Sequence, residues 1–299
     1  MHSMCEPDPK RTEDRWRLRV GYDGRPFLGW QRQDQGPTVQ EALDTALAVL
    51  LRHPVVCTGA GRTDSGVHAR GQVAHFRSDS VQDPAKLVKG LNALLPRGLA
   101  VRDLEKAPDG FCARYSALWR EYCYRIRDSR DPLDPPNVWR PRRSLDRKSV
   151  AETLAWFEGR RDFEAFSIPR GDGRHTFCTL SMARAVEVPG GMDLWIRGDR
   201  FLHRMVRSLV GFCLDVSEGR MGRAEFDRLM SKEPVGPRFW APPDGLTLER
   251  VGYPDWTEPA DRGQPDAPGS RDLEPPTTRK AAFPAVSTGT ASSPGTRGS

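Results

Sequence analysis

Two periodicities that follow one another near the start of the chain constrain its fold most. Residues 15–22, RWRLRVGY, alternate basic and apolar side chains, which predicts a half-exposed β-strand with a basic outer face. Residues 38–51, TVQEALDTALAVLL, space apolar side chains three and four positions apart behind a Thr38 and Glu41 capping pair, which predicts an amphipathic helix. A strand followed closely by a helix indicates a fold that mixes α and β structure.

The same two patterns recur along the chain, with strands and helices interleaved. Strand-like segments are residues 117–127 and 244–253, and helix-like segments are residues 149–159, 201–219 and 223–233. The pattern favours an α+β fold in two halves, 14–108 and 109–255, of which the first carries the Asp64 loop discussed below. We expect residues 1–13 to be flexible. Residues 256–299 are rich in Pro, Gly, Ser and Thr, which predicts a disordered tail.

Charge and cysteine usage restrict the partners and the compartment. The chain has 46 Lys and Arg against 40 Asp and Glu, a net charge of +6, and excess basic residues favour a polyanionic partner such as nucleic acid. None of the six cysteines forms a Cys-x-x-Cys pair, which indicates neither a zinc ribbon nor a disulfide framework and predicts reduced thiols in the cytoplasm. No apolar run approaches the roughly 18 residues of a membrane span, so we expect no membrane partner.

The glycine-rich stretch GAGRTDSGVHARGQVAHF, residues 59–76, joins two expected strands and concentrates chemically active side chains. Asp64 commonly would be a turn residue that accepts backbone hydrogen bonds. Alternatively, it is a carboxylate held in a tight loop as a nucleophile or base, which Arg62 keeps ionised. His68 and His75 raise the further alternatives of a metal site or a hydrolase, but their spacing is unlike that of zinc ligands.

Two residues outside this loop also have two interpretations. Tyr122 alternates with polar residues in a strand pattern, which suits core packing or the stacking of an extruded base. Arg207 stands among the apolar positions of the expected helix over residues 201–219. A buried guanidinium needs a carboxylate partner, and Asp64 is the candidate.

Seven motifs occur in an order that resembles the TruA-type family of tRNA pseudouridine synthases. They are YDGRPFLGWQRQ, TVQEALDTAL, GAGRTDSGVHARGQVAHF, NALLP, FCARYSALWREYCYRI, FLHRMVRSLVG and GLTLERVGY. The resemblance implies that Asp64 is the catalytic carboxylate and that Arg207 pairs with it. It also implies that Arg62, Tyr122 and Leu246 contact the substrate nucleotide.

The resemblance further implies a fold and a reaction. Family members have two ferredoxin-like halves whose strands form one continuous, mostly antiparallel sheet flanked by helices. They isomerise uridine to pseudouridine at positions 38 to 40 in the anticodon arm of tRNA, act as homodimers and use no metal or organic cofactor. We therefore expect a cytoplasmic, tRNA-modifying isomerase.

Several departures keep a second function open. Ser65 stands where the family commonly has alanine, Cys112 replaces a frequent histidine, and residues 167–180 lack the family's usual Ser-Arg-Thr pattern. A noncatalytic RNA-binding or RNA-chaperone homologue of the family is therefore the alternative to an active enzyme.

Overall fold

A computed structural model describes residues 13–128, 130–169, 175–254 and 256 of the chain, all within one compact unit. The elements up to residue 106 are β1 (Arg15–Tyr22), α1 (Val39–Leu51), β2 (Thr58–Gly59), β3 (His68–Arg77), α2 (Pro84–Leu94) and β4 (Leu99–Lys106). The elements after it are β5 (Trp119–Arg127), α3 (Arg147–Ala155), β6 (Gly159–Asp162), β7 (Phe177–Val188), β8 (Gly191–Gly198), α4 (Met205–Ser217), α5 (Arg223–Met230) and β9 (Leu246–Gly252). Strands and helices are therefore interleaved, as the two periodicities predict.

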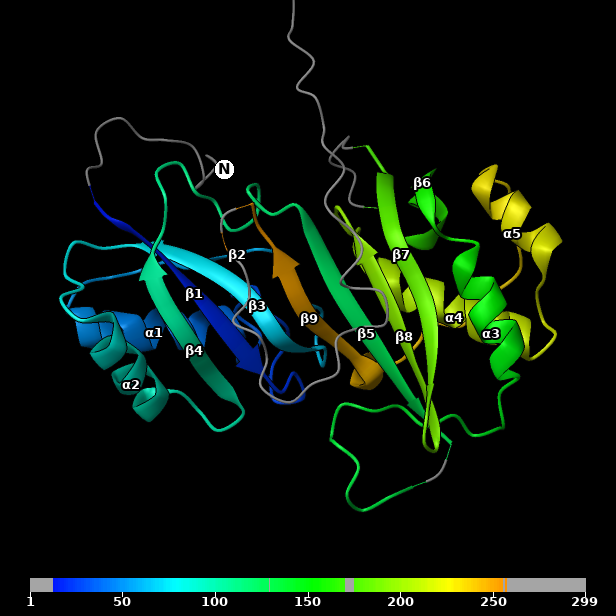
Figure 1. The fold of residues 1–299 in the computed structure, drawn as a ribbon, viewed down its shortest axis with the longest axis horizontal. Helices are drawn as coiled ribbons and strands as arrows, with labels where there is room; N and C mark the ends of the chain where they lie inside the picture. Colours follow the sequence, from blue (N-terminus) through cyan, green and yellow to red (C-terminus); the bar gives the residue numbers. More distant parts are fainter. Residues whose placement is uncertain (1–12, 129, 170–174, 255, 257–299) are drawn as a thin grey trace, which may run out of the picture. The chain divides into compact units, whose positions relative to one another are not determined.

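All the strands belong to one sheet, in the order β4-β1-β3-β9-β5-β8-β7-β6, with β2 paired to β3 (Figure 1). Strand β9 comes from the end of the described chain, yet it lies between β3 and β5 and joins the two parts of the sheet. Its pairing with β3 is parallel, whereas the other strand pairs are antiparallel. The predicted α+β fold with one mostly antiparallel sheet is confirmed, while the boundary between residues 108 and 109 stays a prediction.

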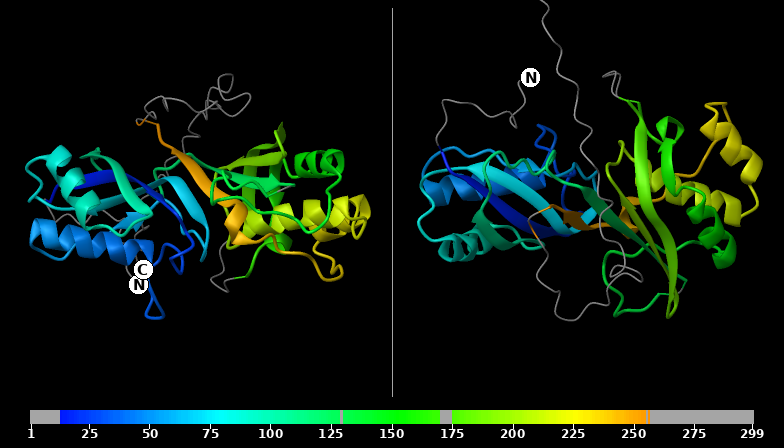
Figure 2. Two further views of the ribbon diagram at one scale, coloured as in Figure 1. Left: turned by 90° about the horizontal axis from the view of Figure 1, so that it is seen from below. Right: turned by 45° about the horizontal axis from the view of Figure 1, so that its top comes forward.

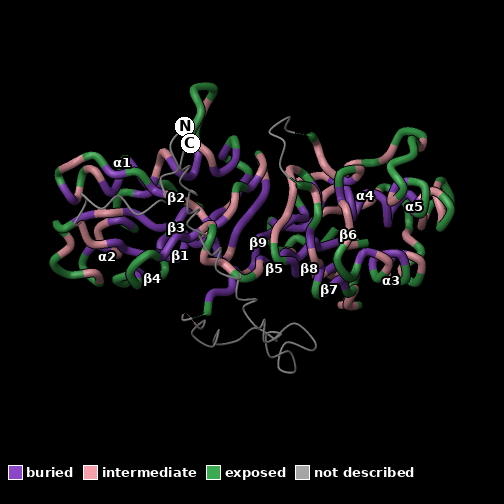
Figure 3. Tube along the Cα trace, turned by 90° about the horizontal axis from the view of Figure 1, so that it is seen from above, coloured by how far each residue is buried: buried purple, intermediate pink, exposed green. Residues whose placement is uncertain are grey.

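The helices pack on the sheet in two groups (Figure 2). Helix α2 lies against α1 and β4, and α3 lies against α4 and β7. Thr38 caps α1, because its Oγ1 accepts a hydrogen bond from the Glu41 N–H at 3.3 Å. The inner faces of the helices and both faces of the central strands are buried, which places the core between the helices and the sheet (Figure 3).

The predicted exposure of the basic face of β1 is wrong. Arg15, Arg17 and Arg19 are all buried. Arg17 forms an ion pair with Glu105 at 2.6 Å, and the guanidinium carbons of Arg17 and Arg19 lie 4.6 and 4.7 Å from the ring centre of Trp256. Alternation identifies the two faces of a strand, but it does not reveal which acids and aromatic rings cover the second face.

The structure shortens one predicted helix. The helix expected over residues 201–219 begins at Met205, because Arg204 has a left-handed backbone with φ 59° and cannot continue the helix.

Four cysteines are free and buried, as predicted: Cys57, Cys123, Cys178 and Cys213. Cys112 is disulfide-bonded, so the prediction of reduced thiols is wrong there. The tail prediction and most of residues 1–13 lie outside the described residues. No helix in the described ranges is long and apolar enough to cross a membrane.

Candidate active site

Asp64 lies in the loop between β2 and β3, and hydrogen bonds from neighbouring elements hold that loop. The Trp30 N–H donates to the Thr63 carbonyl at 3.1 Å, and the Thr63 hydroxyl lies 2.8 Å from the Tyr22 hydroxyl. The Gln72 side-chain amide donates to the Gly61 carbonyl at 2.8 Å. Hydrogen bonds on both sides of Arg62 thus fix the backbone that carries Asp64.

A glycine permits one of these bonds. Gly29 has a φ of 97°, and a Cβ atom at that position would lie 2.6 Å from the Thr63 carbonyl oxygen. A larger residue would clash with the Asp64 loop and would also adopt this backbone conformation unfavourably. Gly29, from the motif YDGRPFLGWQRQ, therefore lets residues 29 and 30 pack directly on the Asp64 loop.

Arg207 faces the same carboxylate from the other part of the chain. It lies in the first turn of α4, and its Nε donates to the Ala241 carbonyl at 2.7 Å. Its Nη1 lies 3.9 Å from Asp64 Oδ2, with 14% of the Arg207 side chain and 23% of the Asp64 side chain exposed. Burial lowers the pKa of the Arg207 guanidinium, and the Asp64 charge opposes that shift. The predicted proximity of the two side chains is confirmed.

His203 approaches the other oxygen of Asp64. Its Nε2 lies 3.6 Å from Asp64 Oδ1. The sequence patterns did not single out this residue, although it lies in the same FLHRMVR motif, four positions before Arg207. Its place in that motif is the signal that could have found it; helical spacing could not, because α4 begins only at Met205.

Tyr122 lies in β5, beside Phe201 and close to Asp64. Its side chain is buried, and its ring meets the Phe201 ring edge-on with the centroids 5.1 Å apart. Burial raises the pKa of the Tyr122 phenol, and electrostatic coupling to Tyr22 and Asp64 adds to the shift. The phenol therefore stays protonated at neutral pH.

Arg62 and Leu246, the two remaining predicted site residues, differ in exposure. Arg62 is exposed, two positions before Asp64 on the surface of the loop. Leu246 is buried at the start of β9, where it pairs with Tyr124 of β5. Arg62 is therefore accessible to solvent, whereas Leu246 belongs to the core.

Arg120 of β5 ties the Asp64 loop to the segment that leads into α4. Its buried guanidinium donates to the Ala60 carbonyl at 2.9 Å and to the Asp199 carbonyl at 2.8 Å. One rigid, planar group thus joins the start of the glycine-rich loop to the chain preceding α4. This contact helps to hold Asp64 and Arg207 at a fixed separation.

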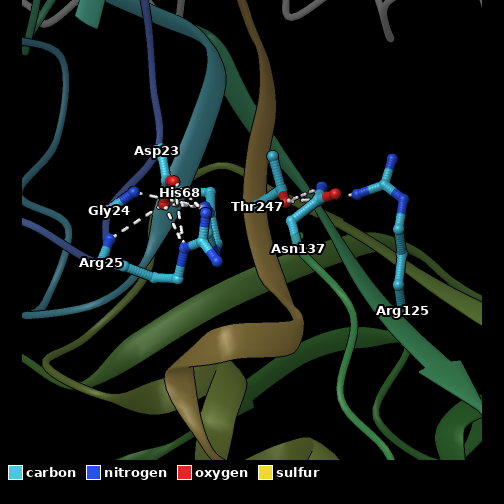
Figure 4. A network of polar contacts seen from close by, with 7 residues as sticks. All are labelled: Asp23, Gly24, Arg25, His68, Arg125, Asn137 and Thr247. Atoms are coloured by element: carbon cyan, nitrogen blue, oxygen red, sulfur yellow. Dashed lines mark hydrogen bonds and ion pairs between the residues drawn. The ribbon is translucent and has the colours of Figure 1, made fainter. Parts of the chain in front are cut away.

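The two histidines of the glycine-rich stretch have partners other than Asp64. The Gly24 N–H donates to His68 Nδ1 at 3.2 Å, and Asp23, which also binds Arg25, lies 3.2 Å from the same nitrogen (Figure 4). The Ala113 N–H donates to His75 Nδ1 at 3.1 Å. Both are buried, which lowers the pKa of each, to about 4 for His75. A hydrolase that pairs either histidine with Asp64 gains no support from this geometry.

Figure 4 also shows a second polar cluster, on the neighbouring strands. The Thr247 hydroxyl of β9 accepts hydrogen bonds from Arg125 of β5 at 3.2 Å and from Asn137 at 2.9 Å. These bonds hold β9 against β5 next to the point where β9 pairs with His68. Among the residues described, no cluster of three His, Cys, Asp or Glu side chains suits a metal ion.

Comparisons of the sequence with known proteins identify one family. The family described as tRNA pseudouridine synthase matches residues 19–116 and 154–254. Proteins named tRNA pseudouridine synthase A are 39% identical in Gloeobacter violaceus, over 80% of each chain, and 39% identical in Maricaulis maris, over 80% of this chain and 98% of the relative. The protein of that name in Nitrobacter hamburgensis is 40% identical over 80% of this chain and 99% of its own length.

Proposed function

Since the chain belongs to the tRNA pseudouridine synthase family, we propose that it isomerises uridine to pseudouridine in tRNA with Asp64 as the catalytic carboxylate. One observation carries this assignment. The carboxylate is partly exposed in a rigid loop and faces a guanidinium at 3.9 Å and an imidazole at 3.6 Å. The two carboxylate oxygens are thus accessible to substrate while a guanidinium and an imidazole face them.

The reaction rearranges one nucleoside without a co-reactant. The N1–C1′ bond breaks, the base turns, and a C5–C1′ bond forms, while C5 loses a proton and N1 gains one. Asp64 can begin this by attacking the base or the sugar as a nucleophile, or by removing a sugar proton as a base. A trapped ester between Asp64 and the nucleoside would favour the nucleophilic route.

The other site residues act on the nucleotide or on Asp64. Taking the target base out of its stack costs a few kcal/mol, and stacking on Tyr122 offsets part of that cost. Arg62, exposed beside Asp64, is suited to hold the backbone of the extruded nucleotide. Arg207 balances the charge of Asp64 within the protein.

We assign the target to positions 38 to 40 of the anticodon arm, as the motifs imply. Unmodified tRNA transcripts, incubated with the protein and mapped for pseudouridine at every uridine, test this directly. Wild-type protein should modify these positions, and the Asp64→Asn variant should modify none. A wild-type protein that binds tRNA and forms no pseudouridine would instead be a noncatalytic RNA-binding homologue.

We further propose that the protein acts as a homodimer in the cytoplasm, where its tRNA substrate is available. The motifs imply a dimer with tRNA lying across both subunits. Sedimentation of the purified full-length chain, alone and with tRNA, should give the mass of two subunits. A monomer that turns over at full rate would refute the dimer.

A further inference from the structure

Hydrogen bonds hold the backbone around His203, which lies next to the proposed catalytic carboxylate. It directly precedes Arg204, whose left-handed backbone ends the approach to α4. The Ile168 N–H donates to the His203 carbonyl at 3.1 Å, and the Met205 N–H donates to the Leu202 carbonyl at 3.1 Å. Backbone bonds on both sides therefore fix where the imidazole begins, although 34% of the side chain is exposed.

The imidazole and the guanidinium approach different oxygens of the same carboxylate. His203 Nε2 is 3.6 Å from Oδ1, and Arg207 Nη1 is 3.9 Å from Oδ2. Both separations exceed a hydrogen bond, but contacts of this kind commonly tighten when substrate fills the site. A carboxylate has about four acceptor positions, so two donors still leave positions that can act on the nucleoside.

A donor on each oxygen restricts rotation of the carboxylate about its Cβ–Cγ bond. With Arg207 alone, either oxygen could turn toward the substrate, and the reactive oxygen would be poorly defined. Reactions at a fixed geometry are fast because the reacting atoms need little further ordering. An imidazole N–H on Oδ1 would supply this second point of attachment.

We infer that His203 is a positioning residue that donates from Nε2 to Asp64 Oδ1 and holds the carboxylate plane for the isomerisation. This inference rests on the proposed function. The rival is an exposed histidine that merely contacts the RNA backbone. Such a contact would contribute to tRNA affinity and not to the chemical step.

The test compares three variants of the full chain with wild type: His203→Leu, His203→Gln and His53→Leu. Gln keeps an N–H donor near the position of Nε2, and Leu keeps bulk without a donor. His53, whose ring nitrogens contact the Pro54 carbonyl and the Ser78 hydroxyl, is the matched control. For each protein we would measure single-turnover pseudouridine formation, tRNA affinity and the thermal unfolding midpoint.

His203→Leu should react about tenfold more slowly, as expected when one hydrogen bond to a charged group is lost. Its tRNA affinity should stay within about twofold of wild type, and His203→Gln should recover most of the rate. Three results would overturn the inference: a wild-type rate for the Leu variant, a loss confined to affinity, or a Gln variant as slow as the Leu variant although its unfolding midpoint matches wild type. If wild type itself forms no pseudouridine, the proposed function fails instead.

Discussion

Asp64 and Arg207 are held in place by different forces. The loop that carries Asp64 is fixed by polar bonds from Trp30, Tyr22 and Gln72. The helix that carries Arg207 is fixed by apolar packing. Its Phe212 meets Phe157 and Phe166 edge-on, with ring centroids 6.0 and 5.7 Å apart.

The aromatic cluster behind α4 is extensive and buried. Its members are Phe157, Phe163, Phe166, Phe212 and Phe226. Buried aromatic pairs stabilise a fold through the area they remove from water and through their edge-to-face geometry. The position of the guanidinium therefore depends on apolar packing, whereas that of the carboxylate depends on a few directed bonds, so the two can be disturbed separately.

Replacing the carboxylate itself should have the largest effect. Asp64→Asn keeps the size of the side chain and removes its charge, and it should slow pseudouridine formation by about 10⁴-fold, as expected for loss of a catalytic base or nucleophile. The unfolding midpoint should stay near that of wild type, because the side chain is partly exposed. A variant that keeps full turnover would show that Asp64 does not initiate the reaction.

Truncating the aromatic cluster should instead destabilise the fold. Phe212→Ala leaves a cavity among buried rings and should cost about 4 kcal/mol in the free energy of unfolding. Urea denaturation measures this, with Val49→Ala on the exposed side of α1 as a control. A loss below about 1 kcal/mol would mean that packing does not hold α4.

The stability of the folded protein should fall in acid because His75 is buried. Burial lowers the pKa of His75 to about 4, against an ordinary value of 6.5. The folded protein therefore binds this proton less readily than the unfolded chain, so stability present above pH 6.5 is lost as pH falls toward 4. The full difference is roughly 3 kcal/mol.

Urea denaturation of wild type and His75→Asn between pH 7 and pH 4 measures this effect. Asn retains an acceptor for the Ala113 N–H, and the variant should lose less stability on acidification. Burial raises the pKa of Asp44 to about 6, but this group is present in both proteins and cancels from the difference. Equal pH dependence in the two proteins would refute the role of His75.

Removing one hydrogen bond from the Asp64 loop should have the smallest effect. Tyr22→Phe deletes the hydroxyl that bonds to Thr63 and should cost about 1 kcal/mol in stability. Its single-turnover rate should fall by a larger factor than that of Phe212→Ala, measured where both proteins are folded. The opposite order would show that these polar bonds do not position Asp64.

The sequence predicts elements whose signals are local. Helix α1 follows from the Thr38 cap and its apolar stripe, and β1 and β5 follow from alternation. The patterns do not reveal α2, despite a cap at Asp83 and Pro84 in its first turn, or the hairpin of β7 and β8. They also do not place β9 between β3 and β5, because strand pairing depends on residues distant in the sequence.

The candidate site shows the same division. The pairing of Arg207 with Asp64 can be predicted, because a guanidinium in an apolar stripe needs a carboxylate. The approach of His203 depends on the left-handed turn at Arg204, which no sequence pattern announces. The burial of Leu246 likewise follows from where β9 inserts into the sheet.

The single-turnover rate of Arg207 variants shows whether Arg207 and Asp64 act together as the catalytic pair. Arg207→Met should react about 100-fold more slowly with tRNA affinity nearly unchanged, and Arg207→Lys should regain part of the rate because it keeps the charge. An Arg207→Met protein that forms pseudouridine at the wild-type rate would contradict the claim.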